Sequence, residues 1–160
     1  MRALLVVNTF ATTTTESVRD VISAALANSL DLTVVSTTGR GDAIEIGAAA
    51  KSQGFELVIG LGGDGTLNEL ANGLLQNGPD LTGPILAAVP GGNANVFARN
   101  LGLPNDAVEA TAKLLELINR KSIKNIGVGK ISSDSIDRWF LFNAGFGLDA
   151  AVLAQMEERR

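Results

Sequence analysis

Short apolar runs alternate along the first 119 residues with longer segments whose apolar residues recur at helical spacing. The runs predict four buried strands, at residues 2–7, 32–35, 55–59 and 85–89. The segments between them predict helices at 15–28, 43–53, from about 67, at 94–101 and after 105. Thr14 or Thr15, Asp42 and Asn105 are the predicted N-caps. This alternation predicts an α/β fold with a doubly wound parallel sheet.

The pattern changes after residue 120. Segments 122–131 and 138–146 have the composition of two strands, joined by a polar turn, so they predict a β-hairpin. We therefore divide the chain into an α/β domain at 1–120 and, at 121–160, the start of a truncated strand-rich domain.

Composition narrows the chemistry. The 160 residues contain no Cys and no His, which excludes disulfides, thiolate or imidazole metal sites and Ser-His-Asp triads. A net charge of −4 gives no electrostatic case for nucleic-acid binding. The apolar run that begins the chain stops at Asn8, too short for a signal peptide or a membrane span, so a cytoplasmic protein is expected.

A glycine-rich turn follows the third predicted strand. Gly60, Gly62 and Gly65 match the spacing G-x-G-x-x-G, and such a turn exposes backbone N–H groups to an anion at a helix N-terminus. A Rossmann site is disfavoured because Asp64 would repel a pyrophosphate without a metal, and because that fingerprint belongs to the first βα turn. A P-loop is disfavoured because Thr66 stands where Lys is required.

The run Gly62-Gly63-Asp64-Gly65-Thr66 resembles the G-G-D-G-T signature shared by diacylglycerol kinases, sphingosine kinases, NAD kinases and 6-phosphofructokinases. Its continuation, Leu67-Asn68-Glu69, is similar to that of the bacterial diacylglycerol kinases. The resemblance implies that these residues, Glu69 included, bind the phosphates of ATP, and that Asp64 serves the Mg²⁺ bound to ATP. The alternative is a glycine turn that only permits close helix–strand packing.

A second glycine turn separates the branches of this superfamily. Residues 90–104, PGGNANVFARNLGLP, resemble the P-x-G-[ST]-x-N-D-x-A-R-x-L-G-[IL]-P block of diacylglycerol kinase catalytic domains, which NAD kinases lack. The resemblance implies that Gly91, Gly92 and Asn95 line the nucleotide cleft. Two positions depart from the family pattern, Asn93 for Ser/Thr and Val96 for Asp. The second departure removes a carboxylate that would orient a metal or phosphate.

Three further residues carry weaker resemblances to the same family. Thr38 lies in a segment similar to T-x-x-x-G-[DH]-A, which implies a contact with the nucleotide. Asn8 matches the Asn of an N-P-x-x-G loop, here rich in Thr, which either donates hydroxyls to phosphate or is a surface loop. Asp149 lies in a segment similar to N-x-x-x-x-G-x-D-A, which implies a place on the lipid side of the cleft; an N-cap role is equally compatible.

These resemblances imply an ATP-dependent lipid kinase that transfers the γ-phosphoryl group to a lipid hydroxyl, with ATP and Mg²⁺ as cofactors and a lipid at the inner membrane surface as partner. Its general base is expected beyond residue 160. An NAD kinase relative and a non-catalytic nucleotide-binding module stay open, as does a homodimer. Basic residues between 120 and 138 form either a membrane-facing patch or an ordinary solvated face.

Overall fold

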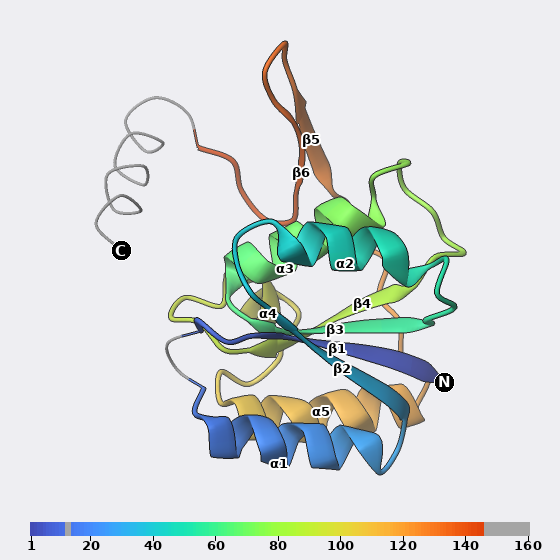
Figure 1. Ribbon diagram of the computed structural model, residues 1–160, viewed down its shortest axis with the longest axis vertical. Helices are drawn as coiled ribbons and strands as arrows, with labels where there is room; N and C mark the ends of the chain where they lie inside the picture. Colours follow the sequence, from blue (N-terminus) through green and yellow to red (C-terminus); the bar gives the residue numbers. More distant parts are fainter. Residues whose placement is uncertain (12–13, 146–160) are drawn as a thin grey trace.

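The computed structural model describes residues 1–11 and 14–145, and its centre is a four-stranded parallel sheet (Figure 1). The strands are β1 (Arg2–Asn8), β2 (Asp31–Thr37), β3 (Leu57–Gly62) and β4 (Ile85–Pro90). Their order across the sheet is β2-β1-β3-β4. From β1 the chain first adds β2 on one side and then β3 on the other, so the direction of winding reverses between β1 and β3.

Helices cover both faces of the sheet. They are α1 (Glu16–Ala27), α2 (Asp42–Ala50), α3 (Asp64–Leu74) and α5 (Ala107–Asn119). Figure 1 shows α1 and α5 below the sheet and α2 and α3 above it. Successive residues of β1 alternate between the two cores: Leu5 packs with Ile22 and Leu26 of α1, whereas Leu4 packs with Leu70 of α3. Burial on both faces explains why the central strands β1 and β3 are continuous apolar runs, whereas the edge strand β2 is largely exposed or half-buried. The predicted doubly wound parallel sheet is confirmed.

A short helix, α4 (Val96–Asn100), adds a third apolar cluster beside β4. Phe97 and Leu103 are 4% and 9% exposed and pack with Leu67 of α3 and Ala88 of β4. The apolar residues of the second glycine block therefore belong to the core.

Two predicted N-caps are wrong and one is confirmed. Thr15 caps α1, where its hydroxyl accepts from the N–H of Val18. Asp42 is the first residue of α2 rather than its cap, because Gly41, with φ of 91°, makes the turn into the helix. Asp106 rather than Asn105 caps α5.

Two glycines bring α2 and α3 into backbone contact. A Cβ on Gly73 would lie 2.1 Å from the carbonyl oxygen of Ile44, and a Cβ on Gly47 would lie 2.7 Å from that of Leu70. Both distances are far below normal van der Waals contact, so no side chain fits at either position. This packing places the first two turns of α2 against the last two turns of α3.

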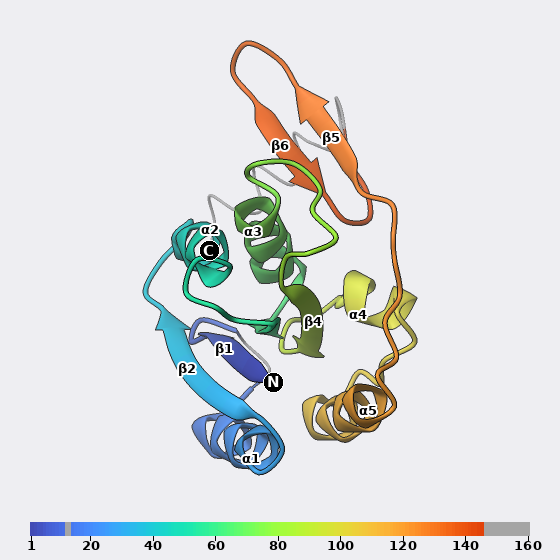
Figure 2. The ribbon, with the colours of Figure 1, turned by 90° about the vertical axis from the view of Figure 1, so that its right-hand side faces the viewer.

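The predicted hairpin is present but shorter than expected. It consists of β5 (Gly129–Ser132) paired antiparallel with β6 (Asp137–Phe140), and residues 122–128 are in no strand. Figure 2 shows the hairpin rising beyond α3. The side chain of Asn72 on α3 both donates to the carbonyl and accepts from the N–H of Trp139, as a neighbouring strand would. The division of the chain at residue 120 stays a prediction.

Several basic residues of this region have acidic partners. Lys130 pairs with Asp137 and lies over the ring of Trp139, and Arg120 pairs with Glu116. These contacts dilute the basic patch considered above. Within residues 1–11 and 14–145, no helix combines the length and the apolar character needed to cross a bilayer.

Candidate functional site

The predicted site residues within the described ranges gather at the carboxyl edge of the sheet. In open α/β sheets this edge, at the point where the winding reverses, is where ligands bind. Here that point lies between the ends of β1 and β3. Asn8, the last residue of β1, spans it: its Nδ2 donates to the hydroxyl of Thr66 on α3 at 2.8 Å. Thr66 is only 6% exposed, so this bond links the end of β1 to the first turns of α3 in the interior of the protein.

The two glycine turns face each other backbone to backbone. The N–H of Gly91 donates to the carbonyl of Gly62 at 2.9 Å. A Cβ on Gly92 would lie 2.7 Å from the Cα of Gly63, and one on Gly91 would lie 3.1 Å from the Cα of Gly62. The absence of side chains at these positions is therefore required for the two turns to meet.

The first turn is tighter than the sequence suggested. Gly60 is a buried residue within β3 rather than part of the turn, and Gly62 is the buried last residue of that strand, where the turn begins. A Cβ on Gly60 would lie 2.7 Å from a methyl carbon of Leu67. Gly63 is the N-cap of α3, which has no side-chain cap. Gly65, in the first turn of α3, is exposed and has nothing within 4 Å of a built Cβ. Close packing thus explains Gly60 and Gly62, and it leaves Gly65 unexplained.

Asp64 connects the two turns. Its Oδ2 accepts the N–H of Val96 and its Oδ1 the N–H of Phe97, both at 3.0 Å. These are the first two residues of α4, whose own N-cap, Asn95, makes no side-chain cap bond to the helix. The carboxylate of α3 therefore caps α4, where a negative charge is favoured.

Asn95 holds the second turn in shape. It is 2% exposed and adopts a left-handed conformation with φ of 47°. Its Oδ1 accepts from the N–H of Gly92, and its Nδ2 donates to the carbonyl of Gly92 and to Oδ1 of Asn105. This bond to Asn95 occupies the Asn105 side chain that the sequence placed as a helix cap. The amide of Asn95 is thus directed into the loop itself.

The loop between β2 and α2 completes the edge. Oδ2 of Asp42 accepts the N–H and the hydroxyl of Thr38, at 2.7 and 2.6 Å, and the N–H of Gly39 at 3.1 Å. These bonds hold the pKa of the Asp42 carboxyl below its usual value. Thr38 is exposed, and its hydroxyl oxygen keeps lone pairs that can accept. Glu69 of α3 accepts the N–H of Gly41 with both oxygens, at 3.2 Å each.

The acidic residues of this edge do not form a protein-only magnesium site. They suit a Mg²⁺ ion that is bound mainly by the phosphates of a nucleotide. The described residues contain no group of three acidic, His or Cys side chains that could hold a metal ion. Mg²⁺ in phosphoryl-transfer sites is commonly bound by one or two carboxylates together with substrate phosphates and water. Each oxygen of Asp64 accepts one N–H and retains further acceptor capacity, so it can still take a magnesium-bound water.

Some residues of the site were not predicted from the sequence, and one predicted residue lies outside the described part of the chain. The main chain of Val96 and Phe97 takes part through N–H groups that no side-chain pattern reveals. The hydroxyl of Thr14 is buried without a hydrogen-bond partner, and a Cβ on Gly91 would lie 3.0 Å from it. Asp149 lies outside the described residues.

This geometry defines an α/β domain with two apposed glycine turns at a topological switch point. Residues 2–131 match the family model described as the diacylglycerol kinase catalytic domain, and the chain belongs to that family.

Relatives of known name agree with the family assignment. A protein of Chromohalobacter salexigens named "Probable lipid kinase YegS-like" is 35% identical over 130 residues, which are 81% of this chain and 40% of that protein. A Bacillus subtilis protein named "Diacylglycerol kinase" is 34% identical over 111 residues, 69% of this chain and 33% of that protein. A crystal structure described as a diacylglycerol kinase from Bacillus anthracis superposes with a TM-score of 0.68 at 34% identity, over 79% of this chain and 44% of the other. The chain thus spans less than half the length of these relatives.

Proposed function

We propose that this chain is the nucleotide-binding part of an ATP-dependent lipid kinase, which transfers the γ-phosphoryl group of ATP to a lipid hydroxyl. The observation that carries the proposal is the apposition of two glycine turns, Gly62-Gly63 and Gly91-Gly92, beside the uncapped N-terminus of α3. Membership of the diacylglycerol kinase family supports ATP as the donor.

The main chain would bind the phosphates. The first N–H groups of α3 have no partners within the helix, and they carry the positive end of its dipole. Gly65 leaves open space over this turn, so an oxyanion can approach the backbone closely. Thr38 and Thr14 border the same edge: the Thr14 hydroxyl has no partner and can donate to the nucleotide, whereas the Thr38 hydroxyl donates to Asp42 and can only accept.

Asp64 would bind the Mg²⁺ of the metal-bound triphosphate, directly or through a water molecule. When bound, Mg²⁺ neutralises the charge that develops on the phosphoryl oxygens. In the transfer, the lipid oxygen forms the new bond to the γ-phosphorus and the bond from that phosphorus to the bridging oxygen of ADP breaks. The proton of the lipid hydroxyl passes to a general base, which we assign to the part of the relatives' length that this chain does not span.

Substitution of Asp64 tests the catalytic role. In the intact protein, Asp64→Asn should lower the rate of lipid phosphorylation at least about 100-fold, which corresponds to roughly 2.7 kcal/mol of transition-state stabilisation. The assay follows label from γ-³²P-ATP into diacylglycerol in mixed micelles. Near-normal turnover by the variant would refute this role of Asp64.

Nucleotide preference separates the alternatives. ATP with Mg²⁺ should raise the melting temperature of the 160-residue chain more than NAD does, since a ligand that binds only the folded state stabilises it. Equal shifts with both would favour an NAD kinase relative, against which the 90–104 block already argues. Nucleotide binding by an intact protein that phosphorylates no lipid would favour a non-catalytic module.

A further inference from the structure

Side chains in the first two turns of α3 form hydrogen bonds with the three other segments that meet at the carboxyl edge of the sheet. Thr66 accepts from Asn8 at the end of β1, Glu69 accepts from Gly41 in the β2–α2 loop, and Asp64 accepts from the main chain at the start of α4. Each bond joins residues at least 28 positions apart in the sequence. No other helix within the described residues has side-chain bonds of this kind to three loops.

The loops joined in this way have conformations that need support. Gly41 and Asn95, the residues that lead into α2 and α4, are both left-handed, with φ of 91° and 47°. Such a conformation is unfavourable for Asn, and for Gly it restricts a backbone that is otherwise freer than any other. Glu69 bonds Gly41 directly, and Asp64 bonds the two residues that follow Asn95. Ionised acceptors make hydrogen bonds roughly twice as strong as neutral ones, so carboxylates suit this purpose.

The family motif places these three side chains at intervals that reach different neighbours. On a helix, residue 64 points away from residues 66 and 69, which are three positions apart and share one face at successive turns. Residue 64 meets α4, residue 66 the end of β1, and residue 69 the residue that leads into α2, whose first turn the glycine contact between α2 and α3 brings close. The spacing therefore matches the positions of the three loops.

We propose that Asp64, Thr66 and Glu69 are positioning residues, which hold the three neighbouring loops in the arrangement that receives the nucleotide. This inference rests on the proposed function for its ligand, and it assigns Glu69 an action through Gly41 instead of a contact with ATP. Asp64 then has two roles, because its carboxylate braces α4 with or without a metal-bound nucleotide.

Two substitutions of Glu69 separate bracing from direct binding. Glu69→Gln keeps an oxygen that can accept from Gly41 and loses the charge, whereas Glu69→Ala loses both. We expect the affinity of the 160-residue chain for MgATP to fall less than about threefold in the first variant and about tenfold or more in the second, as judged by titration calorimetry. Equal losses in both variants would show that the charge acts on the ligand, and would overturn the proposal.

Amide hydrogen exchange gives a readout that needs no nucleotide. In Glu69→Ala the amide of Gly41 should lose protection while those of Val96 and Phe97 keep it, and Asp64→Ala should give the opposite pattern. Unchanged exchange of Gly41 in Glu69→Ala would overturn the proposal even if ATP binds normally. Failure of the wild-type chain to bind ATP would instead refute the proposed function, and the exchange pattern would still decide the bracing.

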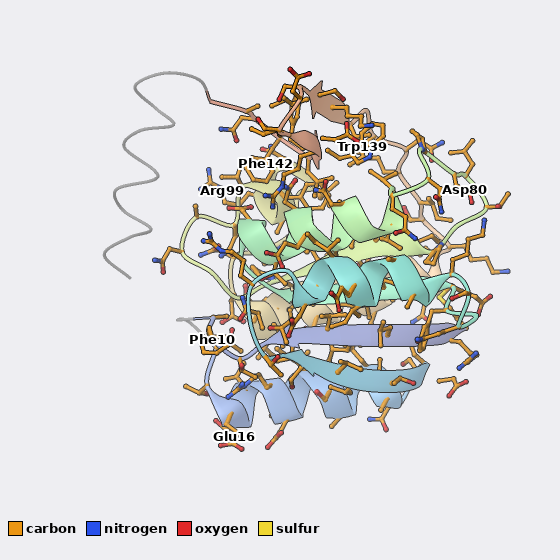
Figure 3. The ribbon with its side chains drawn as sticks, turned by 45° about the horizontal axis from the view of Figure 1, so that its top comes forward. Phe10, Glu16, Asp80, Arg99, Trp139 and Phe142 are labelled. Carbon is orange, nitrogen blue, oxygen red and sulfur yellow. The ribbon has the colours of Figure 1, made fainter. Side chains whose placement is uncertain are left out.

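Asp80→Asn is the matched control. Asp80 also accepts a backbone N–H, that of Thr82, but lies in the loop that leads into the amino end of β4. Figure 3 shows it at the opposite end of the molecule from Phe10 and Arg99, which border the carboxyl edge. This variant should leave both the MgATP affinity and the exchange of the three amides unchanged. Changes equal to those in Glu69→Ala would mean that general loosening, not bracing, accounts for the results.

Discussion

Gly65 is the position at which binding and stability can be separated most cleanly. It is an exposed residue in the first turn of α3, its φ is not positive, and a methyl group built on it meets no atom within 4 Å. If ATP phosphates lie against this turn, the methyl group of Gly65→Ala will occupy the space through which they approach. The substitution therefore perturbs the proposed ligand and spares the fold.

The structure sets the size of both effects. Replacing Gly by Ala at a compatible position stabilises a protein by roughly 0.4–1 kcal/mol, mostly because the unfolded chain loses freedom. For a domain of this size that corresponds to a rise in melting temperature of about 1–4 °C. Binding should weaken at least about tenfold, or roughly 1.4 kcal/mol, since a displaced phosphate loses its best-aligned N–H donors.

Thermal unfolding and titration calorimetry with MgATP measure the two effects on one sample. Gly73→Ala is the control: it makes the same chemical change in the same helix, but its methyl group would lie 2.1 Å from the carbonyl oxygen of Ile44. Overpacking of this kind costs about 1–3 kcal/mol or more, so that variant should melt lower. Gly65→Ala with raised stability and unchanged ATP affinity would refute the placement of the phosphates at this turn.

Further predictions concern the C-terminal end of α3, the loop that leads into β4, and the metal. Asn72→Ala should shift the fluorescence of Trp139, the single Trp, to longer wavelength, because the hairpin loses two bonds to α3; an unchanged spectrum would contradict this docking. Lys51 and Thr82 hold the pKa of Asp80 below its usual 3.8, so its stabilising effect is complete above that pH and is lost as the pH falls below it. Urea unfolding of wild type and Asp80→Asn should therefore show a gap at pH 7 that narrows below about pH 4; a gap that widens on acidification would contradict it. Chelation of Mg²⁺ by EDTA should reduce the ATP-induced rise in melting temperature, and an equal rise without the metal would exclude a metal-bound triphosphate.

The architecture was predictable because each element has a strong local signal. The central strands β1 and β3 are buried on both faces, which produces apolar runs that differ clearly from the amphipathic helices between them. Helix starts were less predictable, because more than one residue at each start can cap. Asp42 and Asn105 have suitable side chains, but in the fold both are bonded to other loop residues, Thr38 and Asn95. Tertiary partners thus decide which candidate becomes the cap.

The hairpin shows a second limit of local reading. Segment 122–128 has strand-like composition, yet it has no neighbouring strand within the described residues and makes no ladder. Among residues 122–145, the strands are β5 and β6, which pair with each other across a short turn. The contact of Asn72 with Trp139, 67 positions apart, depends on the whole fold and has no sequence signal of its own.

Val96 shows how the structure changes the meaning of a sequence departure. Read as a motif, Val at this position is a missing carboxylate, and it weakens the case for a complete metal site. In the structure, residue 96 contributes its main chain: its N–H reaches Asp64, while Phe97 beside it anchors α4 in the core. Any residue other than Pro supplies that N–H, so Val96 preserves the hydrogen bond that connects the two glycine turns.

An acid at position 96 would stand next to the Asp64 carboxylate, and like charges that close would repel each other unless a cation lay between them. Val at position 96 therefore removes one acid and leaves the contact between the two glycine turns intact. Asp64 remains the only carboxylate of the described residues that joins both turns. Val96→Asp should accordingly strengthen the dependence of ATP binding on Mg²⁺, and an identical Mg²⁺ titration for variant and wild type would show that residue 96 does not face the metal-bound phosphates.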